Sequence, residues 1–307
     1  MRLREDATFF LSSQWARENR LVSNVLNATE PELKTPEEVE RQGQEKSAPS
    51  AHVVYEAIRQ EGVHELERKT SSLAWSGLAA GMSMGFSFLS QMLLRQHLPD
   101  TSWRPLLTKL GYAVGFLIVI LGRQQLFTEN TLTVILPLLL HKTARVLRAV
   151  LRLWATVLLA NLAGAFAFAF VLARTSAVDP AMRPTLERIA TEAISQPFMT
   201  LMLRGVFAGW LIALMVWLLP AAESARIWVI VLITYLIGLG DFPHIIAGAI
   251  EAFYIGIIGV RGWLDVLGGY ALPTLIGNTI GGVALVAVLA HAQIIGDKQK
   301  SPEQRLA

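Results

Sequence analysis

The sequence predicts an all-α, polytopic membrane protein in which two of the membrane-spanning helices are broken. Of its 307 residues 53% are hydrophobic and only 17% are charged, and the mean hydropathy of +0.44 is too high for an ordinary soluble domain. Two polar stretches, Gly122–Thr131 and Gly238–Gly248, interrupt long apolar runs. The second contains Asp241, Pro243 and His244, which cannot all face lipid, because a charge in hydrocarbon costs ~2.5 kcal/mol or more. We therefore expect both breaks to line protein or water.

Several function classes are excluded by composition. There is no cysteine, which rules out disulfides and thiolate metal sites, and the formal charge is only +3. The basic residues lie beside apolar segments, as in membrane topology signals, so no nucleic-acid partner is expected. Neither a Ser/His/Asp arrangement nor a His-x-x-x-His motif occurs at usable spacing. We expect no enzymatic activity, no cofactor and no metal site.

The chain divides into four regions. Residues 1–49 are polar and contain three prolines, so they bury too little surface to fold alone and are expected to form a disordered cytoplasmic tail. From Ser50, a suitable helix cap, apolar residues recur at helical spacing and predict an interfacial helix over 50–72. A transmembrane channel domain is expected over 73–295 and a cytoplasmic C-terminal tail over 296–307.

Six membrane spans are expected, because one crossing needs about 20 apolar residues. Their approximate bounds are 73–94, 108–140, 151–173, 197–219, 227–260 and 272–294. The second and fifth runs are too long for single helices and contain the polar breaks, so each is interpreted as two half-helices.

A dense basic loop is expected after the second span. It consists of His141, Lys142, Arg145, Arg148 and Arg152. The positive-inside rule places this loop in the cytoplasm, and counting spans in both directions puts the N- and C-termini there as well.

The two halves of the apolar region resemble each other weakly but in order. The corresponding segments are Gly81–Phe88 with Gly205–Leu214, the break around Phe127 with that around Phe242, and Asn161–Ala165 with Asn278–Gly282. Three spans per half is an odd number, so the halves run in opposite directions and form an inverted 3+3 repeat. Both breaks then lie near the membrane midplane, where Phe127 and Phe242 are expected to face one another across a pore. The small residues on the first and fourth spans predict close helix packing.

These residues resemble the formate/nitrite transporter family. The resemblance rests on the ordered combination of Gly122–Thr131, which includes Leu126-Phe127-Thr128, with Asn161–Gly164, His244 and Gly277–Gly282, and it covers about 73–294. The long polar N-terminal extension makes the chain similar in particular to the YfdC-type branch of the bacterial inner membrane.

The resemblance implies a homopentamer of aquaporin-like protomers in the lipid bilayer, each with its own pore for small monovalent anions such as formate, nitrite, acetate or hydrosulfide. It also implies a set of pore residues, carried over position by position. These are the loop threonine Thr128, the aromatic residues Phe127 and Phe242, the central histidine His244 and the sixth-span asparagine Asn278.

The sequence departs from the family pattern in the predicted vestibule and pore. The family's vestibule lysine, shortly before the fourth span, aligns with Ala193, and the nearest basic residues are Arg174 and Arg188. Two asparagines of the family pattern appear as Gly209 and Gly248. The missing lysine puts the attraction of anions in question.

The predicted chemistry is passage of a weak acid in its neutral form, because a bare anion loses its hydration at high cost in an apolar constriction. His244 is expected to donate a proton or to polarise the substrate, since imidazole titrates near physiological pH. Thr128 and Asn278 are expected to orient this histidine or to hydrogen-bond the substrate. Phe127 and Phe242 are expected to form the gate.

Other polar residues near the breaks have two interpretations each. Glu129 and Asp241 are expected to cap half-helices, the alternative being that they bias the pore against anions. Asn161 either holds a loop or contacts the substrate. Glu251 either lies at a subunit interface or pairs with an arginine.

Two other functions remain open at this point. Without the vestibule lysine, the pore could serve small neutral solutes such as water, ammonia or an undissociated acid. Alternatively, the chain could be a membrane protein whose N-terminal extension serves partner binding.

Overall fold

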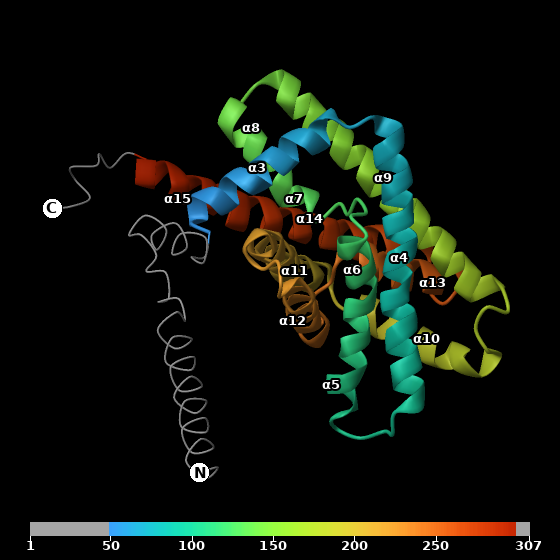
Figure 1. The fold of residues 1–307 in the computed structure, drawn as a ribbon. Coiled ribbons are helices and arrows are strands. Elements are labelled where there is room, and N and C mark those ends of the chain that lie inside the picture. The colour runs from blue at the N-terminus through green and yellow to red at the C-terminus, as the bar shows by residue number, and fades with distance from the viewer. Residues whose placement is uncertain (1–48, 299–307) are drawn as a thin grey trace, which may run out of the picture. The chain divides into compact units, whose positions relative to one another are not determined.

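The computed structural model describes residues 49–298, and in this range all regular secondary structure is helical, with no β-strand (Figure 1). The predicted tail at 1–49, with its possible partner-binding role, and most of the tail at 296–307 lie outside the described residues. In chain order the elements are α3 (Ala51–Glu67), α4 (Thr70–His97), α5 (Arg104–Thr108), η1 (Lys109–Gly111), α6 (Tyr112–Leu121), α7 (Asn130–Thr133), α8 (Ile135–His141), α9 (Ala144–Arg174), η2 (Pro180–Met182), α10 (Arg183–Ile194), α11 (Phe198–Leu218), η3 (Leu219–Ala221), α12 (Arg226–Leu239), α13 (Ile245–Ile257), η4 (Asp265–Ala271), α14 (Leu272–Ile280), η5 (Gly281–Val288) and α15 (Leu289–Lys298).

Five helices are long and apolar enough to cross a membrane, which confirms an all-α membrane fold. They are Thr70–His97, Arg104–Leu121, Ala144–Arg174, Phe198–Ala221 and Asp265–Gln293. Three further apolar helices are too short to cross: Asn130–His141, Arg226–Leu239 and Ile245–Ile257. These short helices lie next to the two polar breaks, as expected of half-helices.

The basic group after α8 is not the loop that the sequence predicts. Helix α9 begins at Ala144, so Arg145, Arg148 and Arg152 lie in its first turns. Arginine is a good helix former, and the Thr143 side chain caps this helix by accepting a backbone N–H from the first turn, so helix formation extends into the basic segment.

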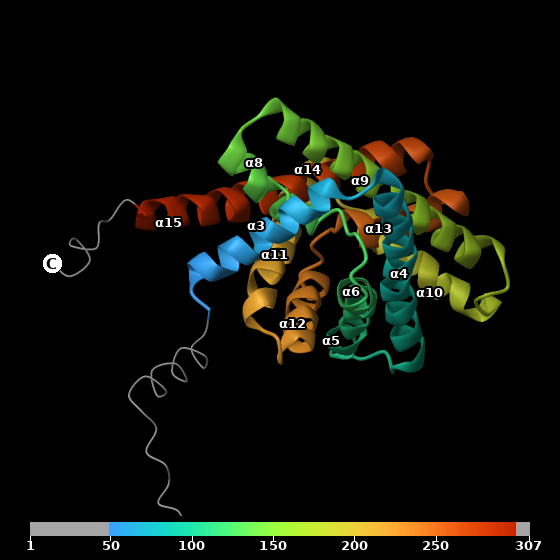
Figure 2. The same cartoon turned by 45° about the horizontal axis from the view of Figure 1, so that its top comes forward.

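Helix α3 lies across one end of the bundle, and α5 and α10 lie at the opposite end (Figures 1 and 2). The predicted cap is present: Ser50 Oγ accepts the N–H of Val53 at 3.4 Å. Val54, Tyr55 and Ile58 are buried on the inner face of α3, which packs on α7, α8 and α11. The helix is therefore docked onto the membrane domain.

The two breaks begin with the same backbone motif. Helix α6 ends at Leu121 and α12 at Leu239, and in each case the second residue beyond the end is left-handed, Arg123 with φ 49° and Asp241 with φ 48°. The residue after each left-handed one donates its backbone N–H to a carbonyl of the preceding helix: Gln124 to Val119 O at 2.9 Å and Phe242 to Ile237 O at 3.1 Å. This is the Schellman ending of a helix, formed here without glycine at the left-handed position.

Two helix pairs pack at backbone distance through small residues, α4 on α9 and α11 on α14. A Cβ added to Gly81 would lie 2.0 Å from the carbonyl oxygen of Asn161, and one added to Gly209 would lie 2.1 Å from that of Asn278. The small-residue faces therefore serve packing, as expected, and they bring each asparagine close to its neighbouring helix.

We predict that Gly81→Ala destabilises the protein by about 1–3 kcal/mol, because the added methyl group overpacks a backbone contact that cannot move aside. Thermal unfolding in detergent, followed by circular dichroism, measures the effect. Gly268→Ala is the control, since no atom lies within 4 Å of a Cβ added there. Equal unfolding temperatures for the two variants would contradict the packing argument.

Candidate functional site: two cavities on either side of a clamped constriction

Asn161, on α9, holds the first break. Its side-chain oxygen accepts the N–H of Phe127 at 2.9 Å, and its amide nitrogen donates to Gln125 O at 2.8 Å and to Gly77 O on α4 at 2.7 Å. The side chain is fully buried. Its amide therefore satisfies backbone groups of the break that would otherwise lack partners inside the membrane domain.

Asn278, on α14, holds the second break in the same way. Its side-chain oxygen accepts the N–H of Ile245 at 2.8 Å, and its amide nitrogen donates to Pro243 O and to Gly205 O on α11, each at 2.9 Å. Both amide hydrogens are used and the side chain is fully buried. Of the two expected roles, the geometry fits orientation of His244, because Asn278 binds the backbone on either side of it.

The two clamps also correct the register of the repeat. They match Gln125 with Pro243, Leu126 with His244 and Phe127 with Ile245. The sequence alignment of the two halves, which paired Phe127 with Phe242, is therefore shifted by a few residues from the structural pairing. It followed the shared aromatic type, whereas the structural correspondence follows backbone hydrogen bonds.

Phe127 and Phe242 each pack on another aromatic ring. Phe127 packs edge-on against Trp154, with ring centroids 5.7 Å apart, and Phe242 stacks on Phe207 at 5.3 Å. Each ring packs on a residue of a different helix, and the prediction that the two rings face one another across a pore stays a prediction. The ring that lies against His244 is Phe116, at 5.0 Å.

His244 and Thr128 lie together, as the sequence predicts for pore residues. Thr128 Oγ1 is 2.7 Å from His244 Nε2, and the residues are 0% and 1% exposed. His244 is also the N-cap of α13, its Nδ1 accepting the N–H of Ala247 at 3.2 Å. Because Nδ1 accepts, the proton of the neutral ring belongs on Nε2, and the histidine donates to Thr128.

This capping arrangement replaces the expected roles of Asp241 and Glu129. Asp241 is 67% exposed at its side chain and pairs with Lys109 at 2.6 Å, while His244 caps the half-helix that follows. Glu129 occupies the cap position of α7 but makes no capping hydrogen bond. The capping expectation is wrong for both carboxylates: His244 caps the helix after Asp241, and N–H groups at the start of α7 are already paired with backbone carbonyls, as in Leu132 and Thr133 with Glu129 O.

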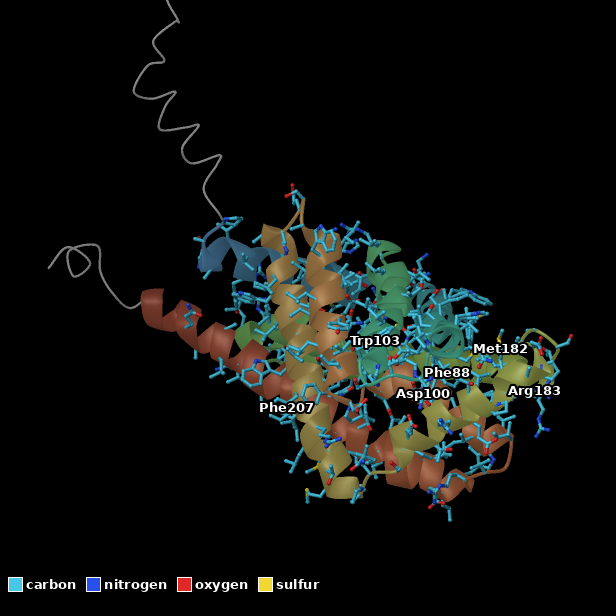
Figure 3. All side chains as sticks on the ribbon, turned by 90° about the horizontal axis from the view of Figure 1, so that it is seen from below. Phe88, Asp100, Trp103, Met182, Arg183 and Phe207 are labelled. Atoms are coloured by element: carbon cyan, nitrogen blue, oxygen red, sulfur yellow. The ribbon has the colours of Figure 1, made fainter. Side chains whose placement is uncertain are left out.

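A cavity of about 490 Å³ reaches His244 from the end of the bundle that holds α5 and α10. Figure 3 looks onto this end, with the lining residue Asp100 labelled. Its charged lining residues are Arg95, Asp100, Arg104, Lys109, Glu192, Arg204, Asp241 and Glu251. We call it the large-charge cavity because of its many charged lining residues. Ala193, which aligns with the family's vestibule lysine, also lines it.

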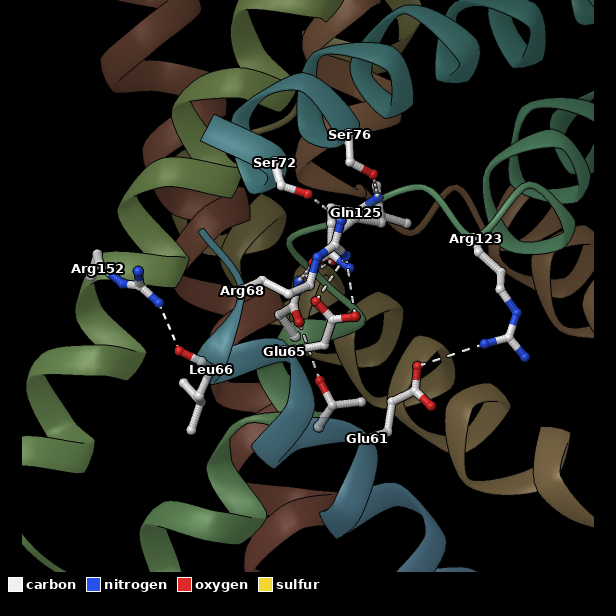
Figure 4. Close-up of polar contacts among 12 residues, drawn as sticks. Glu61, Glu65, Leu66, Arg68, Ser72, Ser76, Arg123, Gln125 and Arg152 are labelled. Atoms are coloured by element: carbon white, nitrogen blue, oxygen red, sulfur yellow. Dashed lines mark hydrogen bonds and ion pairs between the residues drawn. The ribbon is translucent and has the colours of Figure 1, made fainter. Parts of the chain in front are cut away.

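A second cavity of about 660 Å³ lies beneath α3, and we call it the α3 cavity. Glu61 of α3 faces Arg123 of the first break at 4.0 Å, and Glu65 pairs with Arg68 at 3.0 Å (Figure 4). Glu129 and Gln125 line its deep end. The helix before the first span is thus part of a charged mouth, which the sequence pattern alone did not indicate.

The two cavities are separated by buried side chains. Along α6, Tyr112 lines the large-charge cavity and Ile120 the α3 cavity, with the fully buried Phe116 between them. Leu126 and Thr128 are likewise fully buried and line neither cavity. The structure therefore has two mouths and a closed constriction at Thr128 and His244.

The comparisons with known proteins agree with this architecture. Residues 52–292 match the family model described as Formate/nitrite transporter. The chain is 41% identical over 247 residues to the inner membrane protein YfdC of Escherichia coli (strain K12), which covers 80% of each chain. The chain belongs to the formate/nitrite transporter family.

More distant relatives of the family share the fold. The formate channel BtFdhC of Bacillus thuringiensis is 23% identical over 243 residues, covering 76% of this chain and 91% of that protein. A pentameric formate channel with formate bound superposes with a TM-score of 0.60 at 18% identity, covering 74% of this chain and 98% of that one. An FNT family ion channel gives a TM-score of 0.65 at 18% identity, covering 78% and 98%.

Sequence reasoning missed two of the basic residues that line the large-charge cavity. Neither Arg174 nor Arg188 lines the large-charge cavity, and Arg174 instead donates to the carbonyl of Ile257. Arg204 and Lys109 do line it, from α11 and η1. Lys109 is far from Ala193 in the sequence, and Arg204 lies on the next helix along the chain, so only the folded chain brings all three to the same space.

Replacing Asn278 by alanine should destabilise the protein by about 2 kcal/mol or more, because it leaves buried backbone groups on either side of His244 without partners. Thermal unfolding in detergent measures this effect. Asn161→Ala should behave alike, since it removes the equivalent contacts from the other break. An unfolding temperature of Asn278→Ala equal to wild type would refute the clamp.

Proposed function

We propose that the chain is a channel for small monovalent anions of weak acids, such as formate, nitrite or acetate, which cross the constriction in neutral form. The observation that carries the proposal is the Thr128–His244 pair, at 2.7 Å, in a closed constriction with a charged cavity on either side. Family membership supports the substrate class, because the relatives named above include formate channels.

We further propose six spans arranged as an inverted 3+3 repeat, assembled as a homopentamer in the bacterial inner membrane. The matched clamps of Asn161 and Asn278 support the repeat, and the half-helices beside each break supply the second and fifth spans. The basic first turns of α9 lie at the α3 end of the bundle, which supports a cytoplasmic position for that end and for both termini.

In this proposal His244 polarises the substrate through Thr128. The neutral ring donates its Nε2 proton to Thr128 Oγ1, which leaves the threonine hydroxyl hydrogen free to turn toward a substrate oxygen. Phe116, against the His244 ring, and Phe242, at the cavity wall, make the approach apolar, so water is poorly tolerated there. Phe127 is buried next to Thr128 in the chain and packs on Trp154, which holds the first break in place at the constriction.

Arg204 is proposed to take over the anion-gathering role of the family's vestibule lysine. The other basic residues of the large-charge cavity are paired: Arg95 with Glu192 at 2.8 Å, Arg104 with Asp100 at 2.6 Å and Lys109 with Asp241 at 2.6 Å. Among the side chains that the structure describes within residues 49–293, none forms a hydrogen bond or ion pair with Arg204. An unpaired guanidinium is suited to carboxylate and nitrite oxygens.

A pore for small neutral solutes is the second candidate. The paired charges favour it, since three ion pairs leave the cavity with little net field to concentrate anions. Uptake that does not depend on pH, together with free passage of water or ammonia, would favour this candidate over the first.

We predict saturable, acid-stimulated uptake of formate, nitrite or acetate by proteoliposomes between pH 5 and 8, measured by stopped-flow. His244→Ala and Thr128→Val should each lower this flux by about 10- to 100-fold, because the first removes the hydrogen bond that polarises Thr128 and the second removes the hydroxyl group that contacts the substrate, each a contribution of about 1.5–3 kcal/mol. Leu232→Ala, at an outward-facing position, is the control. Undiminished flux through His244→Ala would remove the histidine from the mechanism.

Arg204→Gln should raise the KM for the anion about threefold to tenfold and leave the maximal rate nearly unchanged, because a partly exposed charge contributes about 1 kcal/mol to gathering the anion. The effect should shrink in high salt. Arg188→Gln, which changes an exposed arginine outside the cavity, is the matched control. A KM unaffected by Arg204→Gln would show that anions are gathered elsewhere.

A further inference from the structure

His244 is poorly placed to release or gain protons in this structure. Its Nδ1 faces the N–H of Ala247 and its Nε2 faces Thr128. A second ring proton on Nδ1 would point at a backbone donor, so the cationic ring would lose the cap of α13. Crossing as a neutral acid nevertheless requires a proton, which must come from another group.

Glu251 is a carboxyl group that could supply this proton, and it lies in the large-charge cavity. It belongs to α13, is 8% exposed and lines the cavity. No described side chain or backbone group within residues 49–293 forms a hydrogen bond or ion pair with its carboxyl group. It therefore neither pairs with an arginine nor caps a helix, and a buried carboxyl with no partner has no evident structural use.

Glu251 and His244 lie on the same face of α13. They are seven residues apart, which is about two helical turns, and Gly248 lies between them on that face. All three line the large-charge cavity. Gly248 has no side chain, and the hydroxyl group of Tyr270 occupies the space that a side chain would take: a Cβ at Gly248 would lie 1.7 Å from the Tyr270 hydroxyl oxygen. A hydroxyl group thus sits between the carboxyl group and the histidine.

The cavity connects Glu251 to solvent through the exposed ion pair of Lys109 and Asp241. Lys109, Asp241, Tyr112 and Tyr270 line the cavity together with Glu251. The remaining titratable and charged groups of the cavity come from α4, α5, α10, α11 and the segment before α5. They are Arg95, Asp100, Arg104, Glu192 and Arg204, together with His244 on the same helix.

We propose that Glu251 is a proton-binding site that loads the permeating anion with its proton in the large-charge cavity, before the anion reaches Thr128 and His244. The proposal rests on the function proposed above. It assigns the proton to a carboxyl group that the family pattern does not include, and leaves His244 neutral throughout.

The step balances as a single proton transfer. The Glu251 O–H bond breaks, an O–H bond forms on the anion, and the neutral acid passes the constriction. The Glu251 carboxylate then takes a proton from water at the mouth beside Lys109 and Asp241. The neutral acid releases its proton to water in the α3 cavity, so one proton moves with each anion.

The test compares wild type, Glu251→Gln and Glu251→Asp as full chains in proteoliposomes. Formate uptake is recorded between pH 5 and 8, with a dye that reports internal pH. Glutamine keeps the size and polarity but cannot carry a proton, so the acid stimulation should disappear and uptake at pH 5 should fall at least about tenfold. Aspartate keeps a titratable carboxyl group and should retain acid stimulation. A wild-type pH profile in Glu251→Gln, at whatever overall rate, overturns the proposal.

A second measurement separates this proposal from the function on which it rests. Infrared difference spectra of the purified proteins between pH 5 and 8, without substrate, should show a carboxylic acid band in wild type and Glu251→Asp that Glu251→Gln lacks. If wild type moves no anion but shows this band, the proposed function fails and the proton site stands. If the band is the same in all three proteins, the proton site fails even where formate uptake is found. Size-exclusion chromatography checks that each variant is folded.

Discussion

Much of this structure depends on one constraint, namely that backbone groups inside a membrane must find hydrogen-bond partners within the protein. Two breaks in the helices create such groups, and one asparagine at each break supplies the partners: Asn161 for the first and Asn278 for the second. Each asparagine also bonds to a neighbouring helix, which small residues such as Gly81 and Gly209 bring to backbone distance. The breaks are therefore rigid parts of the fold.

The same constraint explains the chemistry available at the constriction. Asn278 fixes the backbone on both sides of His244, and the histidine then caps α13 with Nδ1. This leaves Nε2 to donate to Thr128, so the local fold itself selects the tautomer. A histidine held in this way suits polarisation better than proton transfer. The unpartnered carboxyl group of Glu251, on the same helix face, is the complementary element.

The sequence predicted the fold class and the pore residues for identifiable reasons. Long apolar runs predict membrane helices, and Asp241, Pro243 and His244 within one of them predict a break, because lipid cannot accommodate them. The paired positions of Asn161 and Asn278 follow from their neighbouring glycines. Contacts between distant residues could not be found in this way. Phe127 was matched with Phe242 on residue type, whereas Phe127 packs on Trp154, and Phe242 occupies the position beyond α12 that Gln124 occupies beyond α6.

By itself, the sequence determined the helical membrane fold, the two breaks and the family, since hydropathy, residue spacing and motif order are local or ordered along the chain. Only the tertiary structure decided which charges share a cavity. Arg204, Glu251 and Tyr270 line the same cavity. These groups come from helices far apart in the sequence, and their electrostatic roles depend on distance and burial, which no linear pattern records.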